Sequence, residues 1–117
     1  MSQEPEELEV LIGFTDIFLK QVKHLEKKYR HITDDIQPTI ASLRCGELVG
    51  DRLTGAEAEV YKVRIKNTDI NKGKSSGYRL IYYVVISSKI VFMTIYSKSE
   101  QEDINISEIQ RIIAMIE

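Results

Sequence analysis

The sequence predicts an α+β fold in which a strand and two helices precede three antiparallel strands and a short C-terminal helix. Two observations support this class. Apolar residues recur at helical spacing in three separate segments, and between the last two of these segments the pattern changes to alternation or to β-branched and aromatic runs. Because 117 residues have room for one hydrophobic core, we expect a single domain over residues 1–117.

The first elements should be a short strand and an amphipathic helix. Residues 8–14 form an apolar run that Gly13 interrupts. Thr15 followed by Asp16 is typical of a helix N-cap with an acidic residue in the first turn. The helix should run to about Arg30, with an apolar stripe that packs on the sheet: Phe18, Val22, Leu25, Tyr29 and Ile32.

A second, shorter helix is expected next. Ile36, Ile40 and Leu43 repeat the helical spacing, and Gly46 follows where a C-terminal cap belongs. Pro38 leaves the start open, because proline fits best in the first turn. The helix therefore begins either near Asp34 with a distortion or near Pro38, and residues 47–59 should form a connecting loop.

The remaining elements are three strands and a helix. Residues 61–66 alternate, so that one face is apolar and Lys62, Arg64 and Lys66 project from the other. Residues 67–77 should form a long hairpin loop, and residues 78–86 and 90–96 are apolar on both faces, as in central strands. Ser107 with Gln110 resembles a capping box before the last apolar stripe, which is Ile109, Ile112, Ile113 and Ile116.

Several function classes are disfavoured. The acidic start, residues 1–9, lacks the features of a secretion signal, and no run is long enough for a membrane helix, so we expect a cytoplasmic protein with no membrane partner. Cys45 is the single cysteine, and the seven-residue separation of His24 and His31 is not a metal-ligand spacing on a helix. We therefore expect no metal site and interpret both histidines as solvated.

Acidic residues also occur in small groups, which caps, loops and solvated turns explain. These groups are Asp34 with Asp35, Glu57 with Glu59, and Glu100 with Glu102 and Asp103. None of them predicts a catalytic carboxylate pair.

Positive charge is concentrated in one segment although the net charge is −2. Between Tyr61 and Ile81, Asp69 is the one acidic residue against six basic residues: Lys62, Arg64, Lys66, Lys72, Lys74 and Arg79. Alternate residues of a strand lie roughly 7 Å apart, so the strand cations repel unless an anion such as a phosphate lies between them. The alternative is a solvated basic edge strand that prevents aggregation.

Three stretches, taken in order, resemble the RelE and HigB toxins of type II toxin–antitoxin systems, in the RelE/ParE superfamily. They are residues 61–65, residues 74–84 with the sequence Lys-Ser-Ser-Gly-Tyr-Arg-Leu-Ile-Tyr-Tyr-Val, and residues 94–104. The resemblance implies a RelE-like fold and a ribosome-dependent endoribonuclease that needs no metal or cofactor. The 2′-hydroxyl of the messenger RNA would attack the neighbouring phosphate, and translation would stop.

The resemblance also implies roles for individual residues. Lys62 is our first candidate for a base, because cations around a lysine disfavour its charged form, and Arg64 lies beside it. Arg79 matches the position that stabilises the pentavalent phosphate. Lys98 completes the catalytic set, and the expected RNA-binding residues are Lys66, Lys72, Lys74 and Tyr96.

The sequence departs from the best-known members, which have an arginine and a tyrosine after the final strand, where this chain reads Ser97-Lys98-Ser99-Glu100. Lys98 or Tyr96 would then have to protonate the leaving group. Two alternatives stay open: a ParE-like toxin that acts on DNA gyrase, and a degenerate homologue that only binds its antitoxin or RNA. The expected partners are the ribosome, mRNA and a cognate antitoxin that covers the basic face or displaces the last helix.

Overall fold

A five-stranded sheet in the order β1-β5-β4-β3-β2 organises the protein. The structure is a computed structural model that describes residues 9–70, 76–101 and 103–116. Its elements are, in chain order, β1 (Leu11–Phe14), α1 (Asp16–Glu26), α2 (Ile32–Arg44), β2 (Asp51–Arg52), β3 (Val60–Ile65), β4 (Tyr78–Ile86), β5 (Lys89–Ser97) and α3 (Ile106–Ile116). The predicted α+β class is confirmed, and the order of the main elements agrees with the prediction.

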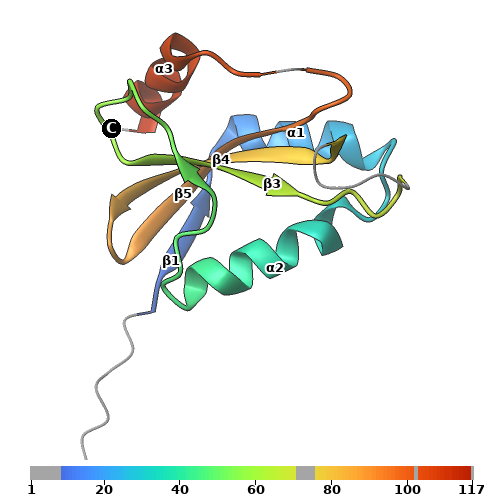
Figure 1. The fold of residues 1–117 in the computed structure, drawn as a ribbon, viewed down its shortest axis with the longest axis horizontal. Helices are drawn as coiled ribbons and strands as arrows, with labels where there is room; N and C mark the ends of the chain where they lie inside the picture. The colour runs from blue at the N-terminus through green and yellow to red at the C-terminus, as the bar shows by residue number, and fades with distance from the viewer. Residues whose placement is uncertain (1–8, 71–75, 102, 117) are drawn as a thin grey trace, which may run out of the picture.

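The first strand lies parallel to the last, whereas every other pairing is antiparallel. β3, β4 and β5 form a meander, and the chain passes from β1 through α1 and α2 to the opposite edge of the sheet (Figure 1). β4 and β5 each have neighbours on both sides. Their position inside the sheet agrees with the apolar sequence on both of their faces.

Apolar clusters cover both faces of the sheet. The first cluster joins α1 and α2 to one face, and the second joins α3 to the other. Figure 1 shows α2 and α3 on opposite sides of the strands. The α3 stripe predicted from sequence is buried at three positions, Ile109, Ile112 and Ile113, in the second cluster. The sheet is therefore the middle of three layers.

The helix boundaries follow the predictions in part. Thr15 caps α1, because its Oγ1 accepts a hydrogen bond of 2.9 Å from the amide of Phe18. α1 ends at Glu26 instead of Arg30, because the amides of Lys28 and Tyr29 turn back to the carbonyl oxygen of Leu25. Both proposed starts of the second helix were late: α2 begins at Ile32 and contains Pro38, whose exposed position keeps its ring off the core.

The predicted loop over residues 47–59 contains the two-residue strand β2, which pairs with β3. Gly50 precedes it with a φ of +93°, and a Cβ there would collide with the carbonyl oxygen of Lys62. The capping-box prediction for α3 was wrong. The side chain of Asn105 accepts the amide hydrogen bond of Glu108 at 2.9 Å, and Ser107 donates to that same Asn105 oxygen.

Candidate nucleic-acid interface

The cations of β3 lie on the sheet face that carries α3. Tyr61, Val63 and Ile65 pack into the first cluster on the opposite face, so the alternate residues Lys62 and Arg64 face away from it. The predicted division of this strand into an apolar face and a basic face is therefore present. Lys66 follows the strand end and is exposed.

A row of three side chains crosses the sheet at one end of this face. Arg64 and Arg79 are Cα partners in the β3–β4 pairing, and Arg79 and Tyr96 are partners in the β4–β5 pairing. Directly opposed residues of antiparallel strands share a face. The row Arg64, Arg79 and Tyr96 therefore brings residues from three strands to one place.

Arg79 is nearly inaccessible, with 5% of its surface exposed. Its Nη1 donates to the carbonyl oxygen of Tyr78 at 3.1 Å. Burial lowers the pKa of the guanidinium, and the neighbouring charge of Arg64 lowers this pKa further. Tyr96 and Asp103 offset part of this lowering. A bound anion would further stabilise two arginines that are cross-strand neighbours when one of them is buried.

Lys62 and Tyr96 meet at the carboxylate of Asp103. The Lys62 Nζ lies 3.4 Å from Asp103 Oδ1, and the Tyr96 hydroxyl donates to the same oxygen at 3.2 Å. Burial, with a contribution from Asp103, raises the pKa of Tyr96 to about 12. The backbone amide of Ile104 is the main cause that lowers the pKa of Asp103, with Lys62 adding to it.

This contact corrects two expectations. The argument for Lys62 as a base assumed that cations surround it, but its ion-pair partner is a carboxylate. Asp103 was expected to be explained by a cap, loop or solvated turn, and it is exposed, but it also contacts two residues of the candidate site, Lys62 and Tyr96. Sequence reasoning missed it because Lys62 and Asp103 are 41 positions apart and share no local pattern.

The structure says less about three other predicted site residues, Lys98, Lys72 and Lys74. Lys98 directly follows β5 and continues its ladder, since its amide donates to the carbonyl oxygen of Gly77 at 2.9 Å. By alternation along the strand it shares the face of Tyr96. Lys72 and Lys74 lie outside the described residues. The structure therefore unites Lys62, Arg64, Arg79 and Tyr96, with Lys98 at the edge of the group.

Asp69, the acidic residue of the basic segment, holds the chain after β3 against α2. Its carboxylate accepts the backbone amide of His31 at 2.8 Å and contacts the His31 Nδ1 at 2.7 Å. Each group stabilises the charge of the other, which raises the pKa of His31 and lowers that of Asp69. Asp35 likewise accepts from the amide and hydroxyl of Thr68. The interpretation of His31 as merely solvated was wrong.

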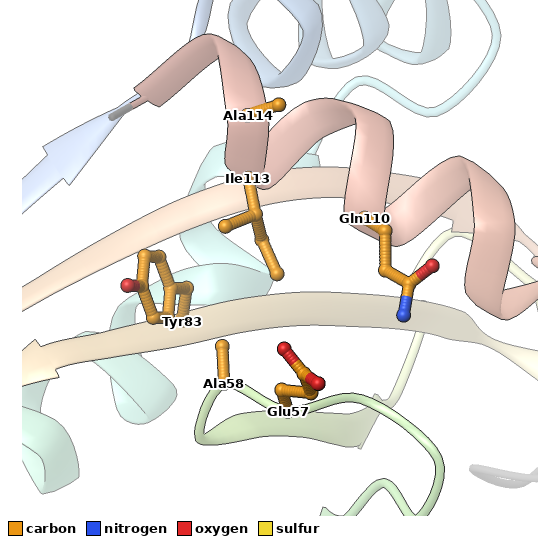
Figure 2. A pocket seen from close by; sticks show the side chains of 6 residues that line it. All are labelled: Glu57, Ala58, Tyr83, Gln110, Ile113 and Ala114. Atoms are coloured by element: carbon orange, nitrogen blue, oxygen red, sulfur yellow. The ribbon is translucent and has the colours of Figure 1, made fainter.

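A hollow of about 560 Å³ lies on the α3 side of the sheet, away from the cations. Figure 2 shows α3 crossing above β4, with Gln110 and Glu57 directed toward one another across the hollow. Its lining contains one carboxylate and no basic side chain: Glu57, Ala58, Tyr83, Gln110, Ile113 and Ala114. A phosphate is therefore better matched by the row at the end of the sheet.

Within the described ranges, no group of three His, Cys, Asp or Glu side chains is arranged to hold a metal ion. No helix in those ranges has the length and apolar character needed to cross a membrane.

Comparison with known proteins identifies the family. Residues 16–116 match the family model of the RelE toxin of the RelE/RelB toxin–antitoxin system. The fold is similar to that of the toxin RelE from E. coli, solved in the free state as a double arginine-to-alanine mutant, with a TM-score of 0.57 and 20% sequence identity. That similarity covers 89% of this chain and 98% of the E. coli chain. Since the family model spans most of the sequence, the chain belongs to the RelE toxin family of toxin–antitoxin systems.

Proposed function

We propose that this toxin is an endoribonuclease that cleaves messenger RNA on the ribosome and so inhibits translation. The observation that carries the proposal is the buried Arg79 lying opposite Arg64, in a row with Tyr96. Such a cluster favours a phosphate, and arginine is suited to it because its planar fork of donors matches phosphate oxygens.

The chemistry needs only the RNA and these side chains. The 2′-hydroxyl attacks the adjacent phosphorus and gives up its proton, the bond from phosphorus to the 5′-oxygen breaks, and this oxygen takes up a proton. The products are a 2′,3′-cyclic phosphate and a 5′-hydroxyl end. Arg79 and Arg64 stabilise the extra negative charge of the pentavalent phosphate. No metal or organic cofactor takes part.

Two proton-transfer roles complete the proposal. Lys62 is the candidate acceptor of the proton of the 2′-hydroxyl, and because its ion pair with Asp103 favours the charged lysine, this role requires that RNA first separates the two side chains. Tyr96 is the candidate donor to the leaving oxygen, because its hydroxyl already donates to an anionic oxygen, Asp103 Oδ1, at 3.2 Å. Lys98, beside the end of β5, is the second candidate donor. Lys66, Lys72 and Lys74 would bind flanking phosphates of the message.

The same face gives the antitoxin its target. An antitoxin segment that covered the row of Arg64, Arg79 and Tyr96, or that displaced α3 from the second cluster, would prevent RNA from entering. The toxin would then act in the cytoplasm only when it is free of its antitoxin.

Expression of the chain without a partner protein tests the proposal. We expect growth arrest and messages cut at codons that a ribosome occupies, as mapped from the new 5′ ends. Lys62→Ala and Arg79→Ala should abolish cutting, whereas Lys89→Ala, an exposed lysine at the start of β5, should cut normally. Intact messages with stalled DNA replication would contradict the proposal and indicate gyrase as the target. Intact messages without toxicity would indicate a degenerate homologue.

A further inference from the structure

The carboxylate of Asp103 is surrounded by the kinds of donor group that bind a phosphate. A single oxygen, Oδ1, lies within hydrogen-bonding distance of the Lys62 Nζ at 3.4 Å and the Tyr96 hydroxyl at 3.2 Å. The amide of Ile104 donates to the same oxygen at 2.8 Å. An anionic oxygen that accepts from an ammonium, a hydroxyl and an amide has the partners of a phosphate oxygen in a protein site.

The chain between β5 and α3 fixes the position of Asp103 from both sides. Before it, the Ser99 hydroxyl bonds to that of Ser97 and to the Tyr29 hydroxyl, at 2.9 and 3.3 Å. Glu100 also pairs with His24 of α1 at 3.6 Å and with Lys28, in the turn after α1, at 4.0 Å. After it, Ile104 is buried in the second cluster. The described residues on both sides of Asp103 are therefore anchored, and a change in the side-chain rotamer of Asp103 can break its contacts with Lys62 and Tyr96 without loss of either anchor.

The ion pair itself is easily exchanged. The side chain of Asp103 is 65% exposed and that of Lys62 is 30% exposed, so water screens their attraction. An RNA phosphodiester carries one negative charge on two oxygens, as a carboxylate does, but an RNA strand also brings flanking phosphates to the neighbouring cations, which favours RNA in a competition for Lys62.

The contact is specific to Asp103. Asp51 is the Cα partner of Lys62 in the β2–β3 pairing and is therefore its cross-strand neighbour. Among the ion pairs of the described residues, however, Lys62 pairs with Asp103 and not with Asp51. Asp51 thus offers a matched control that carries the same charge close to the same lysine.

From this geometry we infer that Asp103 is an internal competitor of the RNA phosphate, which closes the Lys62 end of the basic face in the free toxin and is displaced when RNA binds. The inference rests on the RNA-binding role proposed above. It adds a residue that sets the affinity of the site for anions. It also explains how an acidic protein can keep a cluster of cations stable before its ligand arrives.

Asp103→Asn provides the test, because asparagine keeps an oxygen for Tyr96 and Ile104 and removes the charge that holds Lys62. Two probes are titrated into the wild type, Asp103→Asn and Asp51→Asn. The first probe is inorganic phosphate, whose binding is measured from the NMR shifts of the backbone amides of Arg79 and Ile104. The second probe is a 2′-O-methyl RNA oligonucleotide that cannot be cleaved, and its binding is measured by fluorescence anisotropy. Thermal unfolding verifies the fold, and Asp103→Ser replaces the asparagine variant if that variant misfolds.

We expect Asp103→Asn to tighten the binding of both probes roughly fivefold, and Asp51→Asn to change it less than about twofold. Phosphate affinity that is unchanged or weaker in Asp103→Asn would overturn the inference, as would an equal gain in Asp51→Asn or a lack of phosphate binding in every variant. Tighter phosphate binding in Asp103→Asn without RNA binding by any variant would support Asp103 as a competitor of anions at this site and would contradict the RNA-binding role on which the proposed function rests.

Discussion

Arg64 and Arg79 are directly opposed across the β3–β4 pairing, and Arg79 is 5% exposed. Two like charges so close to each other cost stability, and the lowered pKa of Arg79 reflects both its burial and the charge of Arg64. Tyr96 and Asp103 act in the opposite direction on this pKa and offset part of the cost. Buried like charges of this kind are typical of functional sites, which agrees with the role proposed for the pair.

Arg79→Met should separate stability from function. Methionine keeps most of the apolar volume of the arginine stem and removes the buried charge. We expect the free energy of unfolding to stay unchanged or to rise by up to about 1 kcal/mol, while RNA cleavage is lost. Urea unfolding and a ribosome-based cleavage assay measure the two effects. Arg44→Met, at the exposed end of α2, should leave cleavage intact. Strong destabilisation by Arg79→Met would show that the arginine is mainly structural.

Thr15→Ala should weaken the connection between α1 and the sheet. The Thr15 hydroxyl accepts from the amide of Phe18 at 2.9 Å and donates to the carbonyl oxygen of Met93 at 2.7 Å. Loss of both bonds should lower the free energy of unfolding by about 1–2 kcal/mol, as measured in urea. Thr33→Ala, at an exposed position of α2, should change it by less than about 0.5 kcal/mol. Equal effects of the two substitutions would contradict the capping role.

The His31–Asp69 pair predicts a pH-dependent stability. The pKa of His31 is raised from 6.5 by its contact with Asp69. Its contribution to the free energy of unfolding is therefore complete below pH 6.5 and is lost as the pH rises through the pKa of the folded state. The pKa of Asp69 is lowered from 3.8, so its contribution is lost as pH falls through the folded pKa. The pair therefore stabilises most between about pH 4 and 6.5. Of the other charges near His31, Asp34 raises its pKa and Arg30 lowers it.

Unfolding of the wild type and of His31→Gln in urea, followed from pH 5 to pH 8.5, tests this dependence. The difference in unfolding free energy between the two proteins should be largest near pH 5 and should shrink as pH rises. His24→Gln is the control for loss of an exposed imidazole, since His24 lies at the longer distance of 3.6 Å from its partner Glu100. A difference that grows with pH would contradict the assigned sign.

Gly77→Ala should disturb the start of β4, next to Arg79. A Cβ at this position would collide with the carbonyl oxygen of Ile65 and would lie 3.0 Å from the amide nitrogen of Asn67. Since both contacts are backbone atoms, the strands must move apart, and we expect a loss of about 1–3 kcal/mol of stability in urea unfolding. In Gly13→Ala the nearest atom would be a Val91 methyl at 4.0 Å, so this control should be nearly neutral. A neutral Gly77→Ala would contradict the close approach of β3 and β4.

Local sequence patterns predicted the elements better than their ends. The alternation of apolar and basic residues around Lys62 predicted β3, and the apolar stripe of the last segment predicted α3. Both patterns arise because one face of each element is buried, which fixes the spacing of its apolar residues. α2 starts before both predicted positions, and β2 exists only because residues 51 and 52 pair with β3, a contact with no signature in so short a stretch. Asn105 caps α3, whereas Ser107 was predicted to do so. Both residue types are common N-caps, so the sequence pattern locates the start of a helix only to within about two residues.

The sequence predicted the cations of the candidate site but neither the carboxylate that pairs with Lys62 nor the carboxylate that pairs with His31. Arg64 and Arg79 were identified from charge clustering and from the family resemblance. Asp103 and Asp69 act through partners 41 and 38 positions away, at Lys62 and His31, and such pairings depend on tertiary packing. The sequence therefore indicated the cations at which we propose that an RNA phosphate binds, but not the carboxylate that pairs with Lys62 in the structure.

The salt dependence of RNA binding tests the central claim most directly. The logarithm of the affinity for a 2′-O-methyl RNA oligonucleotide is plotted against the logarithm of salt concentration for the wild type and Arg79→Met. If Arg79 contacts a phosphate, the variant should bind more weakly and its slope should be smaller by roughly 0.7, the value for one contact to a single strand. Equal affinities and equal slopes for the two proteins would contradict the account.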